Sequence, residues 1–249
     1  MSNILVLGGT TEASALAAAL AARGNDAVLS YAGRVAEPKA QPIAVRVGGF
    51  GGVDGLVAYL REQGVTHMVD ATHPFAARMS ANAVLAAERA GVAYIALTRP
   101  AWLPVAGDRW TRVADIDAAV AALNGPPRRV MLALGRMHVD AFAEQPQHDY
   151  LLRFVDVPDQ PPGLPCHHLV VDRGPFDVEG DRQLMASRGI EVVVCKNAGG
   201  TGASAKLHAA RALGLTVIMI DRPALPARRE VHAVADVMRW LDHGADRGV

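Results

Sequence analysis

The stretch that decides the fold reads Asn3-Ile4-Leu5-Val6-Leu7-Gly8-Gly9-Thr10-Thr11-Glu12-Ala13. An apolar run ends at two glycines, and an alanine- and leucine-rich segment then continues to Arg23. This order is typical of a buried parallel strand, a tight turn and a helix. The glycines allow the backbone to turn sharply and a ligand to approach it closely. The free N–H groups at the start of the helix favour a phosphate.

The spacing of the glycines leaves two interpretations of this turn. A dinucleotide fingerprint reads G-x-G-x-x-G, whereas here Gly8 and Gly9 are adjacent and Ala13 takes the place of a third small residue. The alternative to nucleotide binding is an ordinary strand-to-helix turn of an α/β protein. We predict nucleotide binding, with the pyrophosphate held by residues 8–12.

The end of the next strand indicates which dinucleotide is bound. This strand, residues 26–30, ends at Ser30 and is followed by Gly33 and Arg34. In dinucleotide-binding folds this position lies beside the adenosine ribose, where an Asp or Glu would bond the 2′-hydroxyl. A hydroxyl and a guanidinium instead favour NADP over NAD, because Arg suits the geometry of a 2′-phosphate. The alternative for Arg34 is a solvated loop residue.

The rest of the chain continues to alternate strands with helices. Further strands are predicted at residues 43–47, 68–71, 93–98, 110–113, 130–134, 150–155, 169–172, 192–195 and 216–220, and further helices at 53–63, 78–90, 115–123 and 232–241. Such alternation predicts an α/β fold with parallel sheets and right-handed crossovers.

The two halves of the sequence resemble each other. Residues 87–100, which end in Arg99-Pro100, resemble residues 210–223, which end in Arg222-Pro223. The opening of the chain is likewise repeated at residues 129–135, where a strand runs into Gly135 and a predicted helix. We therefore predict two Rossmann-like domains, residues 1–104 and 105–249, with a cleft between them. Chance likeness among ordinary strand-and-helix units is the alternative.

Composition excludes several classes of protein. The 249 residues are 51% hydrophobic, and 25 Lys and Arg residues balance 25 Asp and Glu residues, so there is no basic excess for nucleic acid. Two cysteines are too few for a disulfide framework. No apolar run has the length of a membrane span, and no signal peptide opens the sequence. We expect a soluble, cytoplasmic protein.

Polar and glycine-rich loops follow several predicted strands. Ligands of open α/β sheets bind outside the carboxyl ends of the strands, so these loops are candidates for binding residues. In the first half the candidates, besides residues 8–10 and 30–34, are Gly48-Gly49 and Thr72-His73-Pro74. In the second half the candidates are Gly135-Arg136, Arg153, Arg173 and the loop from Lys196 to Gly202. Helix capping is the alternative for the glycines of that last loop.

Other motifs that carry chemistry are missing from the sequence. The loop at residues 196–202 lacks the G-x-x-x-x-G-K-[ST] order of a P-loop, and no G-x-S-x-G elbow of a hydrolase occurs. No H-E-x-x-H motif or cysteine pair predicts a metal, so we expect none. The tyrosines lack the Tyr-x-x-x-Lys pair of the short-chain dehydrogenases.

Motifs spread over nearly the whole chain fit one known pattern. They are Leu7-Gly8-Gly9-Thr10 with Glu12-Ala13, Ala32-Gly33-Arg34, Gly48-Gly49-Phe50-Gly51-Gly52, Asp70-Ala71-Thr72-His73-Pro74-Phe75-Ala76, Arg99-Pro100 with Trp102, Gly135-Arg136, Lys196-Asn197 with Gly199-Gly200, Ala205-Lys206-Leu207 and Arg222-Pro223. Together they resemble the precorrin-6A reductase family of cobalamin biosynthesis.

The resemblance implies an oxidoreductase that acts on a CH–CH group. It implies that NADPH reduces one double bond of precorrin-6A to give precorrin-6B, with the cofactor and the substrate between two Rossmann-like domains. The expected partner is a tetrapyrrole polycarboxylate, and neither nucleic acid nor a membrane is expected as a partner. We expect the chain to act as a monomer. The macrocycle carries many acetate and propionate groups, so a protein without net charge needs a local cluster of cations.

These arguments give two sets of predicted site residues. The cofactor set is Gly8, Gly9, Thr10, Thr11, Glu12, Ser30, Gly33, Arg34, Thr72, His73 and Pro74. The set that faces the substrate or the nicotinamide is Arg136, Arg173, Lys196, Asn197, Gly199 and Gly200. No catalytic residue is assigned, and the proton donor remains open among Asp140, Asp149, Asp172, His73 and bound water. The alternatives in function are an NADP-dependent reductase of another polycarboxylate and a non-catalytic NADP-sensing module.

Overall fold

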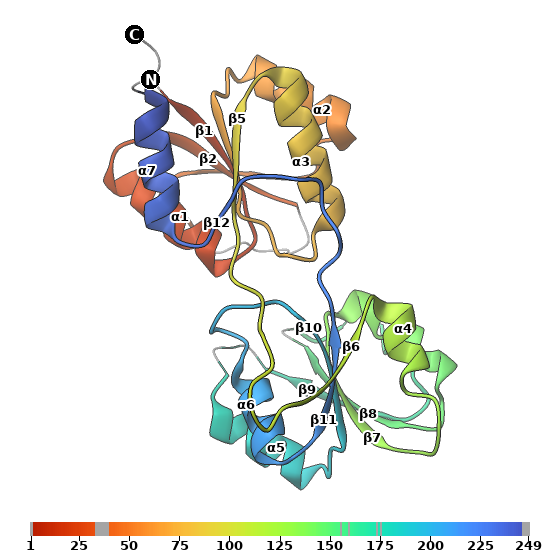
Figure 1. The fold of residues 1–249 in the computed structure, drawn as a ribbon. Helices are drawn as coiled ribbons and strands as arrows, with labels where there is room; N and C mark the ends of the chain where they lie inside the picture. The colour runs from red at the N-terminus through yellow and green to blue at the C-terminus, as the bar shows by residue number, and fades with distance from the viewer. Residues whose placement is uncertain are drawn as a thin grey trace. The chain divides into compact units, whose positions relative to one another are not determined.

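The computed structural model describes residues 2–32, 40–154, 156–158, 160–172, 174 and 176–245. The chain divides into two compact units (Figure 1). The first unit combines Met1–Pro100 with Ala224–Val249, and the second unit is Ala101–Pro223. Each unit contains one six-stranded sheet in which all paired strands are parallel. The predicted α/β class with two Rossmann-like parallel sheets is confirmed.

The sheet of the first unit has the strand order β12-β5-β4-β1-β2-β3. Its strands are β1 (Asn3–Leu7), β2 (Asp26–Tyr31), β3 (Ala44–Val47), β4 (His67–Asp70), β5 (Ala93–Leu97) and β12 (Glu230–Val231). Its helices are α1 (Thr11–Ala22), α2 (Gly52–Glu62), α3 (Ala77–Ala90) and α7 (Val234–Ala245). Helices α1 and α7 cover one face of the sheet, and α2 and α3 cover the other (Figure 1).

Strand β1 shows why the opening stretch of the sequence forms the centre of this sheet. Ile4 and Val6 pack among the residues of α1 and α7, whereas Leu5 and Leu7 pack among those of α2 and α3. Successive side chains of a strand point to opposite faces, so a strand covered on both faces reads as one continuous apolar run. These four side chains are at most 2% exposed.

The sheet of the second unit has the strand order β6-β11-β10-β7-β8-β9. Its strands are β6 (Arg109–Val113), β7 (Arg129–Ala133), β8 (Asp149–Phe154), β9 (His167–Val171), β10 (Val192–Lys196) and β11 (Thr216–Ile220). Its helices are α4 (Ile116–Ala121), α5 (Val178–Ser187) and α6 (Ala205–Ala212), with two short 3₁₀ helices, η1 (Arg136–His138) and η2 (Asp140–Glu144). None of the helices in the described part of the chain is long and apolar enough to cross a membrane.

The segment after Gly135 differs from the prediction. An α-helix was expected there, by analogy with the opening of the chain, but η1 and η2 take its place. Pro146 sets a limit on the far end of this segment, because the residue before a proline is disfavoured in the helical region. Gln145 has φ −118° and ψ 64°, which ends the helical path.

The end of the chain belongs to the first unit. The predicted domains, 1–104 and 105–249, placed it in the second. Strand β12 pairs with β5, with Ala96 N–H donating to Arg229 O at 2.9 Å and Thr98 N–H donating to Val231 O at 3.0 Å. Helix α7 then packs on α1, and Arg23 pairs with Asp242 at 2.9 Å. The reason for the return is burial, since α7 covers the apolar face of the first sheet.

The two sheets repeat one arrangement, which agrees with the predicted duplication. Strands β1 to β5 occupy the positions that β7 to β11 occupy in the second sheet. The sixth strand of each sheet is exchanged, because β6 follows β5 but pairs with β11, and β12 follows β11 but pairs with β5. The two Arg-Pro pairs of the sequence repeat, Arg99-Pro100 and Arg222-Pro223, stand where the chain passes between units.

Candidate functional site

The turn between β1 and α1 needs glycine at two positions for different reasons. A Cβ atom at Gly8 would lie 2.6 Å from Cδ1 of the buried Leu29, which would have to move to admit it. Gly9 has φ +118°, a conformation that side chains rarely adopt, and no atom of the described residues lies within 4 Å of where its Cβ atom would be. The turn therefore has open space in front of Gly9, as a backbone that a ligand approaches requires.

Thr10 connects this turn to the loop that follows β4. Its hydroxyl accepts the N–H of Ala13 at 3.1 Å, as an N-cap residue of α1, and donates to Ala71 O at 2.8 Å. Strand register brings the same elements together, because Leu7 lies opposite both Ser30 and Asp70. The predicted cofactor residues at 8–12, 30 and 72–74 thus follow three neighbouring strands at one edge of the sheet.

Glu12 places a negative charge in the first turn of α1, where a phosphate is expected. The carboxylate accepts the Thr11 hydroxyl at 3.1 Å and pairs with Arg99 at 3.2 Å. Arg99 follows β5, and its side chain is 15% exposed. This partly buried pair offsets the repulsion that the carboxylate would exert on an anion at the helix N-terminus.

The buried Ser30 accepts a hydrogen bond from an arginine that the sequence analysis missed. Arg46 of β3 lies opposite Ser30 in the register and donates to its Oγ at 2.9 Å. Its guanidinium also donates to Gly48 O and Gly49 O and stacks on the Phe50 ring, 3.8 Å from the ring centre. The predicted residues Gly33 and Arg34 lie outside the described residues.

The loop Thr72-His73-Pro74 is built on the carboxylate of Asp70. Asp70 Oδ1 accepts two hydrogen bonds from Thr72, one from its backbone N–H at 3.0 Å and one from its side-chain hydroxyl at 2.7 Å. The ring Nδ1 of His73 accepts the N–H of Phe75 at 3.2 Å, and Pro74 is buried. These contacts fix the path of the loop within the first unit.

The second unit gathers its predicted residues at the carboxyl ends of two neighbouring strands. Lys196 ends β10, and Gly135-Arg136 follow β7, which pairs with β10. Arg136 is exposed, and Lys196 is half-buried. Arg173 lies outside the described residues.

Asn197 and Gly200 hold the segment that enters the second unit. The side chain of Asn197 accepts Trp102 N–H at 2.8 Å and donates to Trp102 O at 3.0 Å. The indole N–H of Trp102 donates to Gly200 O at 2.7 Å. From the other end of the unit, Arg222 donates to Asn197 O at 3.0 Å. Asn197 is 5% exposed and thus has a structural role, while its contact with a substrate stays a prediction.

Two further cations of the second unit are buried. Arg153 pairs with Asp181, and its guanidinium stacks on the Phe176 ring, 3.7 Å from the ring centre. Its charge is already neutralised, which removes it from the expected cluster of free cations. Lys206 lies 5.0 Å from the ring centre of Trp102 and donates to Ala203 O, and burial lowers the pKa of its ammonium.

Two of the candidate proton donors have structural partners. Asp149 is the first residue of β8, at the amino end of the strand, where it accepts the Cys166 thiol at 3.4 Å. Arg136 lies at the opposite, carboxyl end of the same sheet, so Asp149 is not among the residues that gather there. Asp140 accepts the N–H of Gly163 at 3.0 Å. Over the residues that the structure describes, no three His, Cys, Asp or Glu side chains form a metal-binding group.

Fold and site together define a two-unit Rossmann-like α/β protein with polar and glycine-rich loops at the carboxyl edges of both sheets. The family model described as Precorrin-6x reductase CbiJ/CobK matches residues 3–242. The chain therefore belongs to this family.

Individual relatives agree with this assignment over most or all of their length. The chain is 59% identical to the precorrin-6A reductase of Rhodobacter capsulatus, with 100% of both chains covered. It is 32% identical to the cobalt-precorrin-6A reductase of Priestia megaterium, covering 89% of this chain and 91% of the relative. A solved structure described as CobK precorrin-6A reductase superposes with a TM-score of 0.93 and 58% identity, covering 100% of this chain and 98% of that one.

Proposed function

We propose that this protein is a precorrin-6A reductase of cobalamin biosynthesis that uses NADPH to reduce one double bond of the macrocycle. The observation that carries the proposal is the 59% identity to the Rhodobacter capsulatus enzyme over both entire chains. Three relatives that are named cobalt-precorrin-6A reductases are more distant, with at most 32% identity to this chain. We therefore propose the cobalt-free macrocycle as the substrate.

The first unit is the proposed site of the dinucleotide. The open space in front of Gly9 and the N-terminus of α1 suit a pyrophosphate, because backbone N–H groups and the helix dipole favour an anion there. Arg99 offsets the charge of Glu12 in the same turn. Thr10 uses its hydroxyl to cap the helix and to hold the loop after β4, so its proposed contact with the cofactor is through the backbone.

The 2′-phosphate is proposed to lie at the ends of β2 and β3. Arg46 brings a positive charge to Ser30, and an arginine fork matches the oxygens of a phosphate. Arg34 is proposed to act at the same place. Bound NADPH supplies a hydride, and the protein contributes mainly by holding the dinucleotide and the substrate in the reactive orientation.

The second unit is proposed to bind the carboxylates of the substrate. Arg136 is exposed at the end of β7, and Lys196 ends the neighbouring strand β10. We propose that these two cations, together with Arg173, neutralise acetate and propionate groups. Asn197 supports this loop by holding Trp102 in place.

The cofactor assignment is tested by the substitution Arg46→Gln. We expect it to weaken NADPH binding about tenfold, because a charge-assisted contact with the 2′-phosphate is lost, and to change NADH binding by no more than about twofold. Calorimetric titration of both nucleotides measures the two affinities. The control is Arg61→Gln, which removes an exposed arginine of α2 in the same unit.

Comparison of the two nucleotides separates recognition from a general disturbance of the loop. Arg46 also holds Gly48 and Gly49, and a substitution that acted only through that support would weaken NADPH and NADH alike. An equal loss for both nucleotides would remove the proposed role of Arg46 at the 2′-phosphate.

A further inference from the structure

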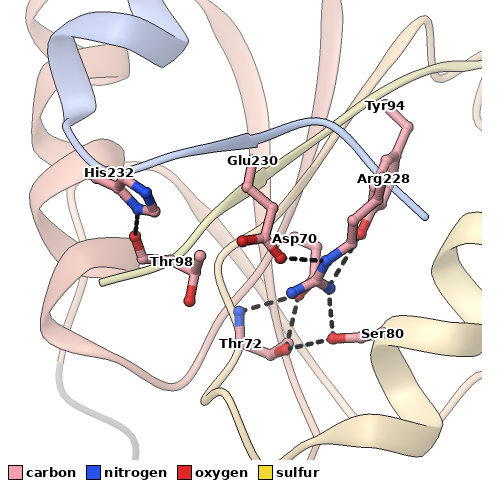
Figure 2. A network of polar contacts seen from close by, with 8 residues as sticks. All are labelled: Asp70, Thr72, Ser80, Tyr94, Thr98, Arg228, Glu230 and His232. Carbon is pink, nitrogen blue, oxygen red and sulfur yellow. Dashed lines mark hydrogen bonds and ion pairs between the residues drawn. The ribbon is translucent and has the colours of Figure 1, made fainter. Parts of the chain in front are cut away.

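A buried arginine from the last part of the chain contacts the strand that carries the loop Thr72-His73-Pro74. Arg228 lies in the segment that enters the first unit just before β12, and its side chain is 7% exposed. Its guanidinium donates to Asp70 Oδ2 at 3.0 Å and to the carboxylate of Glu230 at 2.9 Å (Figure 2). Asp70 is the last residue of β4.

We propose that Arg228 is a positioning residue for the dinucleotide. It holds the carboxylate of Asp70 in the arrangement on which the loop 72–74 is built, and so sets the affinity of the first unit for the cofactor. The inference rests on the function proposed above and on the predicted cofactor site, which includes this loop. It assigns a role to a residue 158 positions away from Asp70 in the sequence.

The hydrogen bonds at Asp70 explain how one contact affects the whole loop. Besides the two bonds from Thr72 to Oδ1, the second oxygen accepts Ser80 Oγ at 2.6 Å, Tyr94 OH at 3.1 Å and Arg228. Both carboxylate oxygens therefore act as acceptors, one toward the loop and one toward the body of the unit (Figure 2). Movement of Asp70 on one side displaces Thr72 on the other.

Arg228 supplies the positive charge for this buried carboxylate. Asp70 is 3% exposed, and its other described donors, Thr72, Ser80 and Tyr94, carry no charge. Burial, with the charge of Asp70 adding to it, raises the pKa of Tyr94, so its hydroxyl remains a neutral donor. Without the guanidinium, the carboxylate would be buried with neutral donors alone, an arrangement that is costly in a low-dielectric interior.

The same arginine is fixed by the strand that follows it. Glu230 begins β12, and Arg229 O accepts the N–H of Ala96 in β5. His232 follows β12, and its Nδ1 atom lies 2.7 Å from the carbonyl oxygen of Thr98. The returning segment thus holds Arg228 from the β5 side of the sheet, so the guanidinium has little freedom to follow a displaced Asp70.

The experiment measures NADP⁺ binding to the full-length protein by calorimetry, with the variants Arg228→Gln and Arg228→Lys. We expect Arg228→Gln to weaken NADP⁺ binding about tenfold, since it keeps donors but removes the charge, and Arg228→Lys to recover about half of that loss on a logarithmic scale. In turnover, the KM for NADPH should rise by a similar factor, while kcat at saturating NADPH changes by no more than about twofold.

Two further variants distinguish positioning from a general loss of stability. Arg23→Gln breaks another pair between the first part of the chain and its end, Arg23 with Asp242, and should leave NADP⁺ affinity unchanged. Ser80→Ala removes one donor to Asp70 together with a 3.3 Å contact to the Thr72 hydroxyl, and should weaken NADP⁺ binding about threefold, even if Arg228→Gln fails to fold.

Several results would overturn the inference. One is an Arg228→Gln or Ser80→Ala protein that binds NADP⁺ as the parent does, and another is an effect of equal size in Arg23→Gln. If the parent protein itself binds no NADP⁺, the proposed function fails together with the inference. If the parent binds NADP⁺ and the variants match it, only the role of Arg228 fails.

Discussion

The arginines at the strand ends differ in whether their charge is already neutralised. Arg99 pairs with Glu12, Arg153 with Asp181 and Arg228 with Asp70, and each of these arginine side chains is at most 15% exposed. Such pairs shape the protein but leave little charge for a ligand. Arg136 is exposed at the end of β7 and is therefore better placed to meet a substrate carboxylate.

Replacement of Arg136 by alanine tests this difference. We expect Arg136→Ala to raise the KM for the macrocycle about tenfold, because one charge-assisted contact with a carboxylate is lost, and to leave the KM for NADPH unchanged. Steady-state kinetics with each substrate varied in turn measures both constants. The control is Arg129→Ala, an exposed arginine at the amino end of the same strand. Unchanged kinetics in Arg136→Ala would place this side chain outside the site.

Single residues were predictable where a local pattern determines their surroundings. The double glycine at residues 8–9 follows from the strand-to-helix turn itself. Arg46 was missed because its contact with Ser30 depends on strand register, which a sequence does not state. Asp70 stood out only as part of a family motif. Its pairing with Arg228 could not be predicted, because the two residues lie 158 positions apart in the sequence.

Elements with strong local signals formed where the sequence predicted them. Helix α3 ends at Ala90, as the helix predicted at 78–90 does, and Gly91 follows it with φ +69°. The helix predicted after Gly135 rested on a likeness to the opening of the chain, and two short 3₁₀ helices stand there instead. For the loop at 196–202 the sequence left ligand binding and helix capping open. Its hydrogen bonds to Trp102 were not predicted, because Asn197 and Trp102 lie 95 positions apart.

The two hydrogen bonds from the Asn197 side chain to the backbone of Trp102 predict a loss of stability in Asn197→Leu. Both bonds from the side chain to the Trp102 backbone disappear, and unpaired polar groups in the interior typically cost about 2 kcal/mol. Urea unfolding of the full chain measures the change. Asn124→Leu is the control, because Asn124 accepts only an exposed bond from Gln145 and should cost less than about 0.5 kcal/mol. A change of similar size in both variants would show that the bonds between Asn197 and Trp102 contribute little to stability.

At the scale of the whole molecule, the sequence repeat predicted two similar sheets but not the exchange of their last strands. Strand β12 has only two residues, too few for a recognisable pattern. The apolar side of α7, with Val237 and Leu241 buried, predicts a helix that packs on some sheet. Nothing in that pattern says which sheet it covers, so the end of the chain was assigned to its neighbour in sequence.

The measurement that tests the central claim most directly is the oxidation of NADPH by the purified full-length protein in the presence of precorrin-6A. The account predicts a loss of NADPH absorbance that depends on the macrocycle, with a product heavier by two hydrogens, one from the hydride and one from a proton. NADPH binding without any macrocycle-dependent oxidation would contradict the account and would favour a non-catalytic protein that senses the nucleotide.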